Sequence, residues 1–271
     1  MTTKTTFTSW ITCPKPNPQA KLRLFCFAYA GASASVFRTW ADDLPATIEL
    51  CPIEIPGRGG QIKSPPYTKI LPLVREIATN IIPCLDKPFA FFGYSMGALI
   101  SFELIRLLRS EYNLYPLHLF IAARCAPQFP RENPPISKLP DADFLAAISQ
   151  FNGTAKMVLE NAELMQIFLP IIRADFTVLE SYVYTSQPPL NCPISAFGGS
   201  EDPTVSYTAL SAWEKQTVAP FSLKMIGGDH FFINTAKSTL VNSVIQSLQK
   251  KGTGNREQGT GNREQIRNKS C

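Results

Sequence analysis

The sequence has no apolar run long enough to cross a membrane. A membrane-spanning helix needs about 20 consecutive apolar residues, whereas the most apolar segment, residues 88–102, is interrupted by Gly93 and Gly97. Residues 2–6 are polar and no apolar stretch follows them, so the pattern of a secretory signal peptide is also missing. We therefore predict a cytoplasmic protein that has no membrane partner.

Paired cysteines and a strong charge imbalance are missing as well. The seven cysteines are odd in number and form no C-x-x-C pair, which argues against a zinc site and a disulfide framework. Of the net charge of +5, the segment from Lys250 onward carries six basic and two acidic residues, which leaves the remaining 249 residues nearly neutral. A body without a basic surface does not indicate nucleic acid as a partner.

The segment 250–271 contains a perfect tandem repeat. Residues 252–258 read Gly-Thr-Gly-Asn-Arg-Glu-Gln, and residues 259–265 repeat them without a change. A repeat without apolar side chains cannot offset the entropy lost on ordering. We predict one domain over residues 1–249 and a disordered tail over 250–271, with a docking tail as the alternative.

Strand-like and helix-like stretches alternate along the body, as in an α/β domain with a mostly parallel central sheet flanked by helices. The sequence predicts six strands, at 22–27, 48–53, 89–92, 117–122, 194–197 and 222–226. The predicted helices outside the segment discussed next are at 37–44, 71–85, 98–108, 207–216 and 239–248.

About 70 residues separate the fourth and fifth predicted strands, too many for a plain loop. We expect a helical insertion at about 128–190, with Asp141 capping its first helix and Pro170 breaking or kinking the region 163–184. Such insertions gate and shape apolar sites, so the prediction is a lid. A structural cap over the sheet is the alternative.

Residues 93–97 read Gly-Tyr-Ser-Met-Gly, a G-x-S-x-G pattern between a predicted strand and a predicted helix. In this context the pattern is typical of the nucleophile elbow of the α/β-hydrolase fold, in which the serine sits on a strained turn. We predict that Ser95 is a nucleophile. An ordinary strand-to-helix turn is the alternative.

A serine hydroxyl needs a base to take its proton, and the chain has only two histidines. His118 lies inside an apolar strand, where a structural role is expected. His230 follows the last strand and a Gly-Gly turn, the position of the base in the order Ser, Asp/Glu, His. We predict His230 as the general base, with an exposed loop histidine as the alternative.

The third member of a triad orients the histidine and stabilises its charged form. Asp202 follows the fifth strand, two strands after the elbow, and is the predicted acid. Glu201 and Asp229 are competitors, but Glu201 points to the other side of the same turn and Asp229 adjoins the histidine too closely.

Acyl transfer also needs hydrogen-bond donors for the oxyanion. The backbone N–H of Met96 is one candidate, because it follows the nucleophile directly. The second is expected from the loop after the first strand, near Tyr29 or Ala30.

Together these motifs resemble the type II thioesterases that accompany non-ribosomal peptide and polyketide synthases, over residues 14–249. The residues that carry the resemblance are found in seven segments, at 27–37, 55–59, 93–98, 139–145, 169–182, 199–203 and 228–232. By that resemblance Ser95, Asp202 and His230 form the triad. Two departures are Gly31-Ala32, where the family often has Gly-Gly, and Tyr94, where it often has His.

The resemblance implies a monomeric enzyme that hydrolyses acyl groups from the phosphopantetheine arm of carrier proteins and so clears stalled synthase modules. The phosphopantetheine belongs to the substrate, so neither a metal nor an organic cofactor is expected. The alternatives are a carboxylesterase or lipase of small esters, an acyl-transferring or cyclising enzyme, and a binding protein without catalysis.

Overall fold

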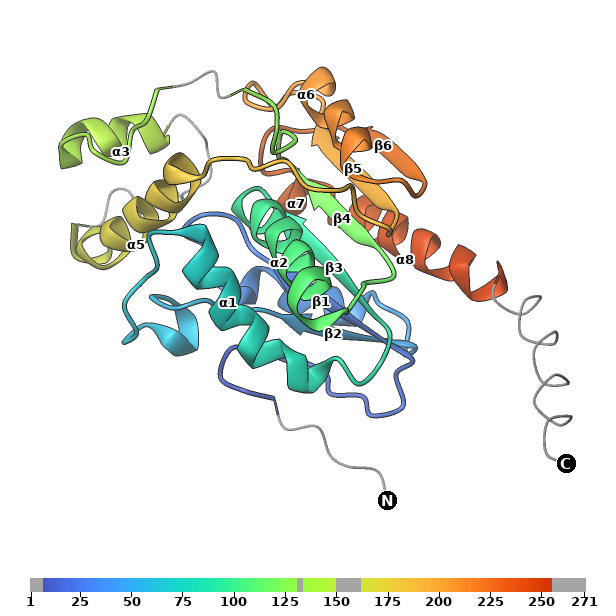
Figure 1. Ribbon diagram of the computed structural model, residues 1–271. Coiled ribbons are helices and arrows are strands. Elements are labelled where there is room, and N and C mark those ends of the chain that lie inside the picture. Colours follow the sequence, from blue (N-terminus) through green and yellow to red (C-terminus); the bar gives the residue numbers. More distant parts are fainter. Residues whose placement is uncertain (1–6, 131–133, 150–161, 255–271) are drawn as a thin grey trace, which may run out of the picture.

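Six short strands form one sheet at the centre of the molecule (Figure 1). The computed structural model describes residues 7–130, 134–149 and 162–254. Within these residues the strand order is β2-β1-β3-β4-β5-β6, and all five neighbouring pairs are parallel. The predicted α/β class with a parallel central sheet flanked by helices is confirmed.

The strands are buried for most of their length because helices cover both faces of the sheet. Every residue is buried in the first five, whereas β6, at the edge, alternates between intermediate and exposed positions up to its buried last residue, Ile226. Their bounds are β1 Leu22–Phe27, β2 Ile48–Pro52, β3 Phe89–Tyr94, β4 Leu119–Ala122, β5 Ile194–Gly199 and β6 Phe221–Ile226. Since the strands are parallel, the loops that follow β1, β3, β5 and β6 meet at one edge of the sheet.

The helices form two layers around the sheet. In Figure 1, α1 (Ile70–Ile81) and α2 (Met96–Tyr112) lie in front of it and α7 (Phe232–Thr235) and α8 (Lys237–Gly254) behind. The shorter elements are η1 Ala34–Asp42, η2 Gly59–Gln61, η3 Ile82–Cys84, α6 Tyr207–Ser211 and η4 Ala212–Gln216. Among the described residues, none of these helices combines the length and apolarity that a membrane span requires.

Each face of the sheet has its own hydrophobic core. On the α1 and α2 side, Ile77 and Leu104 are fully buried in one cluster with Phe91 of β3. On the opposite side, Trp40 of η1 packs edge-on against Phe92 with ring centroids 4.8 Å apart. Alternate residues of β3 therefore anchor both layers, which places the following turn between two rigid cores.

The long gap between β4 and β5 contains the predicted helical insertion, with α3 (Asp141–Ser149) and α5 (Ala162–Ser181). Phe144 and Ile172 form a small separate core between these helices. Arg173 ties them further, because it pairs with Asp141 at 2.7 Å and lies over the Phe144 ring. Residues 131–133 and 150–161 of the insertion lie outside the described residues, and its role as a lid stays a prediction.

The structure corrects two details predicted for the insertion. Pro170 does not break the region, since α5 runs from Ala162 to Ser181 with the proline inside it, whereas a kink there stays a prediction. The hydrogen bonds of the neighbouring turns continue the helix past the one N–H that proline lacks. Asp141 is the first helical residue rather than the N-cap, and its carboxylate receives a hydrogen bond from Arg173.

The structure also shifts several bounds outside the insertion. The helix predicted at 37–44 is the 3₁₀ segment η1, whose start is capped by Ser33 accepting from the Ser35 N–H. The helix predicted at 207–216 is divided into α6 and η4, and α7 was not predicted.

The last helix, α8, continues to Gly254, beyond the predicted start of the tail at residue 250, because each added residue gains one backbone hydrogen bond. The rest of the tail lies outside the described residues.

Helix α2 crosses the strands so closely that two positions must be glycine. A Cβ on Gly93 would overlap the backbone of Gly97 and Ala98. A Cβ on Gly97 would overlap the carbonyl group of Phe27 at the end of β1. Both glycines of the G-x-S-x-G pattern are therefore required by backbone packing.

We expect Gly97→Ala to destabilise the protein by about 1–3 kcal/mol or more, because the new methyl group forces α2 away from β1. Gly60→Ala is the matched control, since a Cβ there meets no atom within 4 Å. Thermal unfolding of both variants measures the difference. Equal midpoints for the two variants would contradict the packing argument.

Candidate active site

Ser95 lies on a sharp turn between β3 and α2. Its backbone has φ 51° and ψ −108°, a conformation that is costly for a residue with a side chain. The Ser95 N–H donates to the Ala122 carbonyl group at the end of β4, at 2.8 Å. Because the strand and helix on either side are buried, the turn is held in place and the hydroxyl group extends beyond the sheet edge.

The structure brings the three residues predicted as a triad together. The Oγ of Ser95 lies 3.2 Å from Nε2 of His230, and Nδ1 of His230 lies 2.7 Å from Oδ2 of Asp202. They come from the loops that follow β3, β6 and β5, which meet at one edge of the sheet. The side chain of Asp202 is fully buried and that of His230 is 12% exposed.

The environment of Asp202 fixes which nitrogen of His230 carries the proton. Burial raises the pKa of this carboxyl group, but hydrogen bonds from His230 and Thr204 outweigh burial and hold its pKa below the usual value. Oδ1 accepts from both the N–H and the hydroxyl group of Thr204, at 2.8 and 2.7 Å. An ionised carboxylate can only accept, so Nδ1 of His230 is the donor and Nε2 presents its lone pair to Ser95.

The residues that we considered as alternatives lie elsewhere. Glu201 is exposed, and Oδ1 of Asp229 accepts the Phe231 N–H at 2.8 Å within its own turn. His118 is buried, its Nε2 lies 2.9 Å from the Ser195 hydroxyl group, and its ring stacks on Phe120. The structure thus places His118 within the sheet packing, as predicted.

The predicted oxyanion donors lie around the same turn. Met96 is the first residue of α2, where a backbone N–H has no partner within the helix. The ring of Tyr29 contacts those of Tyr94 and Phe231, so the loop after β1 lies beside both Ser95 and His230. The Gly31 N–H follows those of Tyr29 and Ala30 in this loop, and it donates to the carboxylate of Asp175.

Two residues with contacts to the trio were missed at the sequence level. The hydroxyl group of Tyr94 donates to the carbonyl oxygen of His230 at 2.6 Å and accepts from the Ile233 N–H at 3.3 Å. Thr204 bonds to Asp202 and also lies 3.1 Å from Nδ1 of His230. An Asp followed two residues later by Thr is a recognisable side-chain turn, whereas nothing in the sequence linked Tyr94 to His230.

A metal centre is not indicated in the part of the chain that the structure describes. There, no three His, Cys, Asp or Glu side chains are grouped so that they could hold an ion. The side chains that meet at the sheet edge supply a serine hydroxyl group, an imidazole and a carboxylate.

Comparisons with known proteins indicate one protein family. A family model described as a thioesterase domain matches residues 22–251. The chain is 43% identical over 240 residues to the gramicidin S biosynthesis protein GrsT of Aneurinibacillus migulanus, covering 89% of this chain and 94% of GrsT. It is 41% identical over 250 residues to LgrE of Brevibacillus parabrevis, which is named a linear gramicidin dehydrogenase, covering 91% and 95%.

Solved structures show the same fold. The chain superposes on YbtT, described as a type II thioesterase from the yersiniabactin NRPS/PKS biosynthetic pathway, with a TM-score of 0.79 and 31% sequence identity. The match covers 88% of this chain and 97% of YbtT.

We expect Tyr94→Phe to slow the labelling of Ser95 by a fluorophosphonate about 10-fold, because loss of the hydroxyl group frees the backbone that carries His230. The buried carbonyl group left without its donor should also destabilise the protein by about 1–3 kcal/mol.

Tyr182→Phe is the control, since this hydroxyl group donates to Glu103, outside the trio. It should lower stability without slowing the labelling. Equal labelling rates for the two variants would show that Tyr94 does not position His230.

Proposed function

This chain belongs to the thioesterase family, and we propose that it hydrolyses acyl groups from the phosphopantetheine arm of carrier proteins. The observation that carries this proposal is the hydrogen-bonded series of Ser95, His230 and Asp202 at the carboxyl edge of the sheet. The similarity to YbtT, a type II thioesterase from an NRPS/PKS pathway, and to the biosynthesis protein GrsT supports carrier domains of a peptide or polyketide synthase as partners.

In the proposed reaction, Nε2 of His230 accepts the proton of Ser95 while Oγ attacks the thioester carbonyl carbon. The C–S bond then breaks, the thiol leaves with the proton from His230, and the acyl group remains on Ser95. His230 next takes a proton from water, whose oxygen attacks the acyl carbon. The ester bond to Oγ then breaks, His230 returns the proton to Oγ, and the carboxylic acid leaves. Asp202 stays ionised throughout and stabilises the imidazolium.

The negative oxygen that forms in each half-reaction needs donors on one side of the carbonyl carbon. We propose the backbone N–H of Met96 together with that of Tyr29 or Ala30. A donor at the start of α2 also has the positive end of the helix dipole behind it. Thiolates leave readily, so stabilising this oxygen matters more than protonating the leaving group.

We propose hydrolysis rather than the redox chemistry suggested by the name of LgrE. Dinucleotide cofactors bind a G-x-G-x-x-G loop after the first strand of their fold. Here the residues after β1 read Ala-Tyr-Ala-Gly-Ala-Ser over 28–33, and the full sequence contains no G-x-G-x-x-G. The proposed reaction uses only side chains, water and the substrate, without a metal or organic cofactor.

We further propose that the protein works as a monomer in the cytoplasm. Among the described cysteines, Cys13, Cys26, Cys51 and Cys84 are free thiols, which suits a reducing compartment. Gel filtration of the purified protein and localisation of a tagged copy would test the two points separately.

The proposed function is tested by offering the protein an acylated carrier protein, the matching acyl-CoA and a nitrophenyl ester. We expect the carrier protein to be deacylated fastest, and Ser95→Ala to lower that rate at least about 10³-fold. Ser110→Ala is the matched control, because Ser110 lies near the other end of α2 and its hydroxyl group donates to the Leu107 carbonyl group of the same helix.

Turnover of the nitrophenyl ester alone would favour a carboxylesterase and contradict the proposal. An unchanged rate in Ser95→Ala would contradict the role of the serine.

A further inference from the structure

The loop after β1, which supplies one proposed oxyanion donor, has a defined turn. The Ala32 N–H donates to the Tyr29 carbonyl group at 3.1 Å, and Gly31 has φ +79°. These are the features of a type II turn with Ala30 and Gly31 at its centre. This turn fixes the directions of its N–H groups relative to one another. Their directions relative to Ser95 are fixed only if the turn itself is held in place.

A buried carboxylate holds this turn. Oδ2 of Asp175, on α5 of the insertion, accepts the Gly31 N–H at 2.7 Å. The same carboxylate binds Arg58 through two bonds of 2.7 Å, one to each of its oxygens, and Arg58 also donates to the Ala32 carbonyl group at 3.3 Å. The side chains of Arg58 and Asp175 are each only 3% exposed.

Helix α5 touches the turn at a second point. A Cβ on Gly31 would lie 2.9 Å from Cγ1 of Ile172, one helical turn before Asp175. The backbone of the turn therefore rests on the helix through both a hydrogen bond and a van der Waals contact. A side chain at this position would press against α5 and lengthen the bond to Asp175.

The far side of the loop is held by another carboxylate. Oε1 of Glu54 accepts the Ala34 N–H at 3.1 Å. Burial raises the pKa of Glu54, although the Ala34 N–H and the charge of Arg58 oppose this effect. Two carboxylates, those of Asp175 and Glu54, therefore each hold one N–H of the loop.

We propose that Arg58 and Asp175 are positioning residues, which set the oxyanion donors of the loop after β1 relative to Ser95. The proposal rests on the proposed acyl-transfer mechanism. The N–H of Ala30 directly precedes that of Gly31, so fixing Gly31 to the bidentate pair fixes the neighbouring donor. Neither side chain bonds to Ser95, His230 or Asp202 in the described structure, so both act through the backbone.

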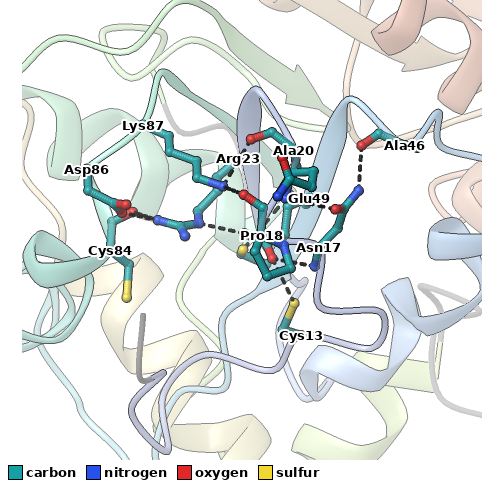
Figure 2. Close-up of polar contacts among 12 residues, drawn as sticks. Cys13, Asn17, Pro18, Ala20, Arg23, Ala46, Glu49, Cys84, Asp86 and Lys87 are labelled. Carbon is teal, nitrogen blue, oxygen red and sulfur yellow. Dashed lines mark hydrogen bonds and ion pairs between the residues drawn. The ribbon is translucent and has the colours of Figure 1, made fainter. Parts of the chain in front are cut away.

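The chain offers a matched control at the opposite edge of the sheet. Arg23 and Glu49 lie near the starts of β1 and β2 and are 2% and 3% exposed, with Nε 2.7 Å from Oε2 (Figure 2). Figure 2 shows the further bonds from Arg23 to Asp86 and to the Cys84 carbonyl group. This pair is as buried as Arg58 and Asp175, but it holds the ends of the strands that face away from Ser95.

The test compares Asp175→Asn with Glu49→Gln, each of which removes the charge of a buried carboxylate that pairs with a buried arginine, although Arg23 keeps its pairing with Asp86. We expect Asp175→Asn to lower kcat about 10- to 100-fold with KM changed less than about 3-fold, because the donors act on the transition state. The affinity for an alkyl boronic acid, which forms a tetrahedral adduct with serine, should fall by the same factor. Glu49→Gln should lower the melting temperature and leave kcat and boronate affinity at the wild-type values.

Arg58→Lys serves as a milder variant if Asp175→Asn does not fold. It keeps the charge but loses the bidentate geometry, so an intermediate loss of kcat is expected. Wild-type kcat and boronate affinity in the folded variants, with only a lower melting temperature, would overturn the proposal.

The same measurements distinguish a failure of the proposed function from a failure of the positioning role. In that case wild-type protein would not deacylate the carrier protein, whereas boronate binding and nitrophenyl ester turnover would still report on the donors. If Asp175→Asn lowered both the boronate affinity and the rate of nitrophenyl ester turnover, the positioning role would be supported even then.

Discussion

The close crossing of α2 over the ends of β1 and β3 is the constraint on which the rest of the site depends. Gly93 and Gly97 leave no room for a Cβ, and this proximity forces the chain to turn within a single residue between strand and helix. Ser95 takes the resulting strained conformation because two hydrophobic cores hold the elements on either side of it. The strained conformation lowers the stability of the protein, and the packing of the two cores offsets this loss.

Much of this arrangement could be predicted from the sequence, because it depends on local patterns. Strand β1 is marked by an apolar run that only Arg23 interrupts, and the serine turn by an apolar run and glycines at fixed spacing. Asp202 and His230 could be predicted because parallel strands bring their following loops to one edge. The local signals failed for the 3₁₀ form of η1 and for the uninterrupted α5 across Pro170, because packing against the rest of the fold can override local preference.

The contacts that support the trio could not be predicted, because they join residues distant in the chain. Tyr94 reaches the backbone of His230 across 136 positions, and Arg58 reaches Asp175 across 117. An arginine and an aspartate in separate motifs carry no information about their pairing until the fold is known. The family resemblance marked both motifs, whereas only the structure gives them a shared contact.

The position of Asp175 has a consequence for protein engineering. Thioesterase chimeras made by exchanging the segment between β4 and β5 would import an aspartate with the new insertion and keep the recipient's Arg58 and Gly31. This segment therefore cannot be exchanged as an independent unit that sets specificity. Its Asp175 side chain accepts a hydrogen bond from Gly31, which lies in the part of the molecule that holds the catalytic residues. Productive crossover points are those that preserve the geometry of this junction as well as the shape of the pocket.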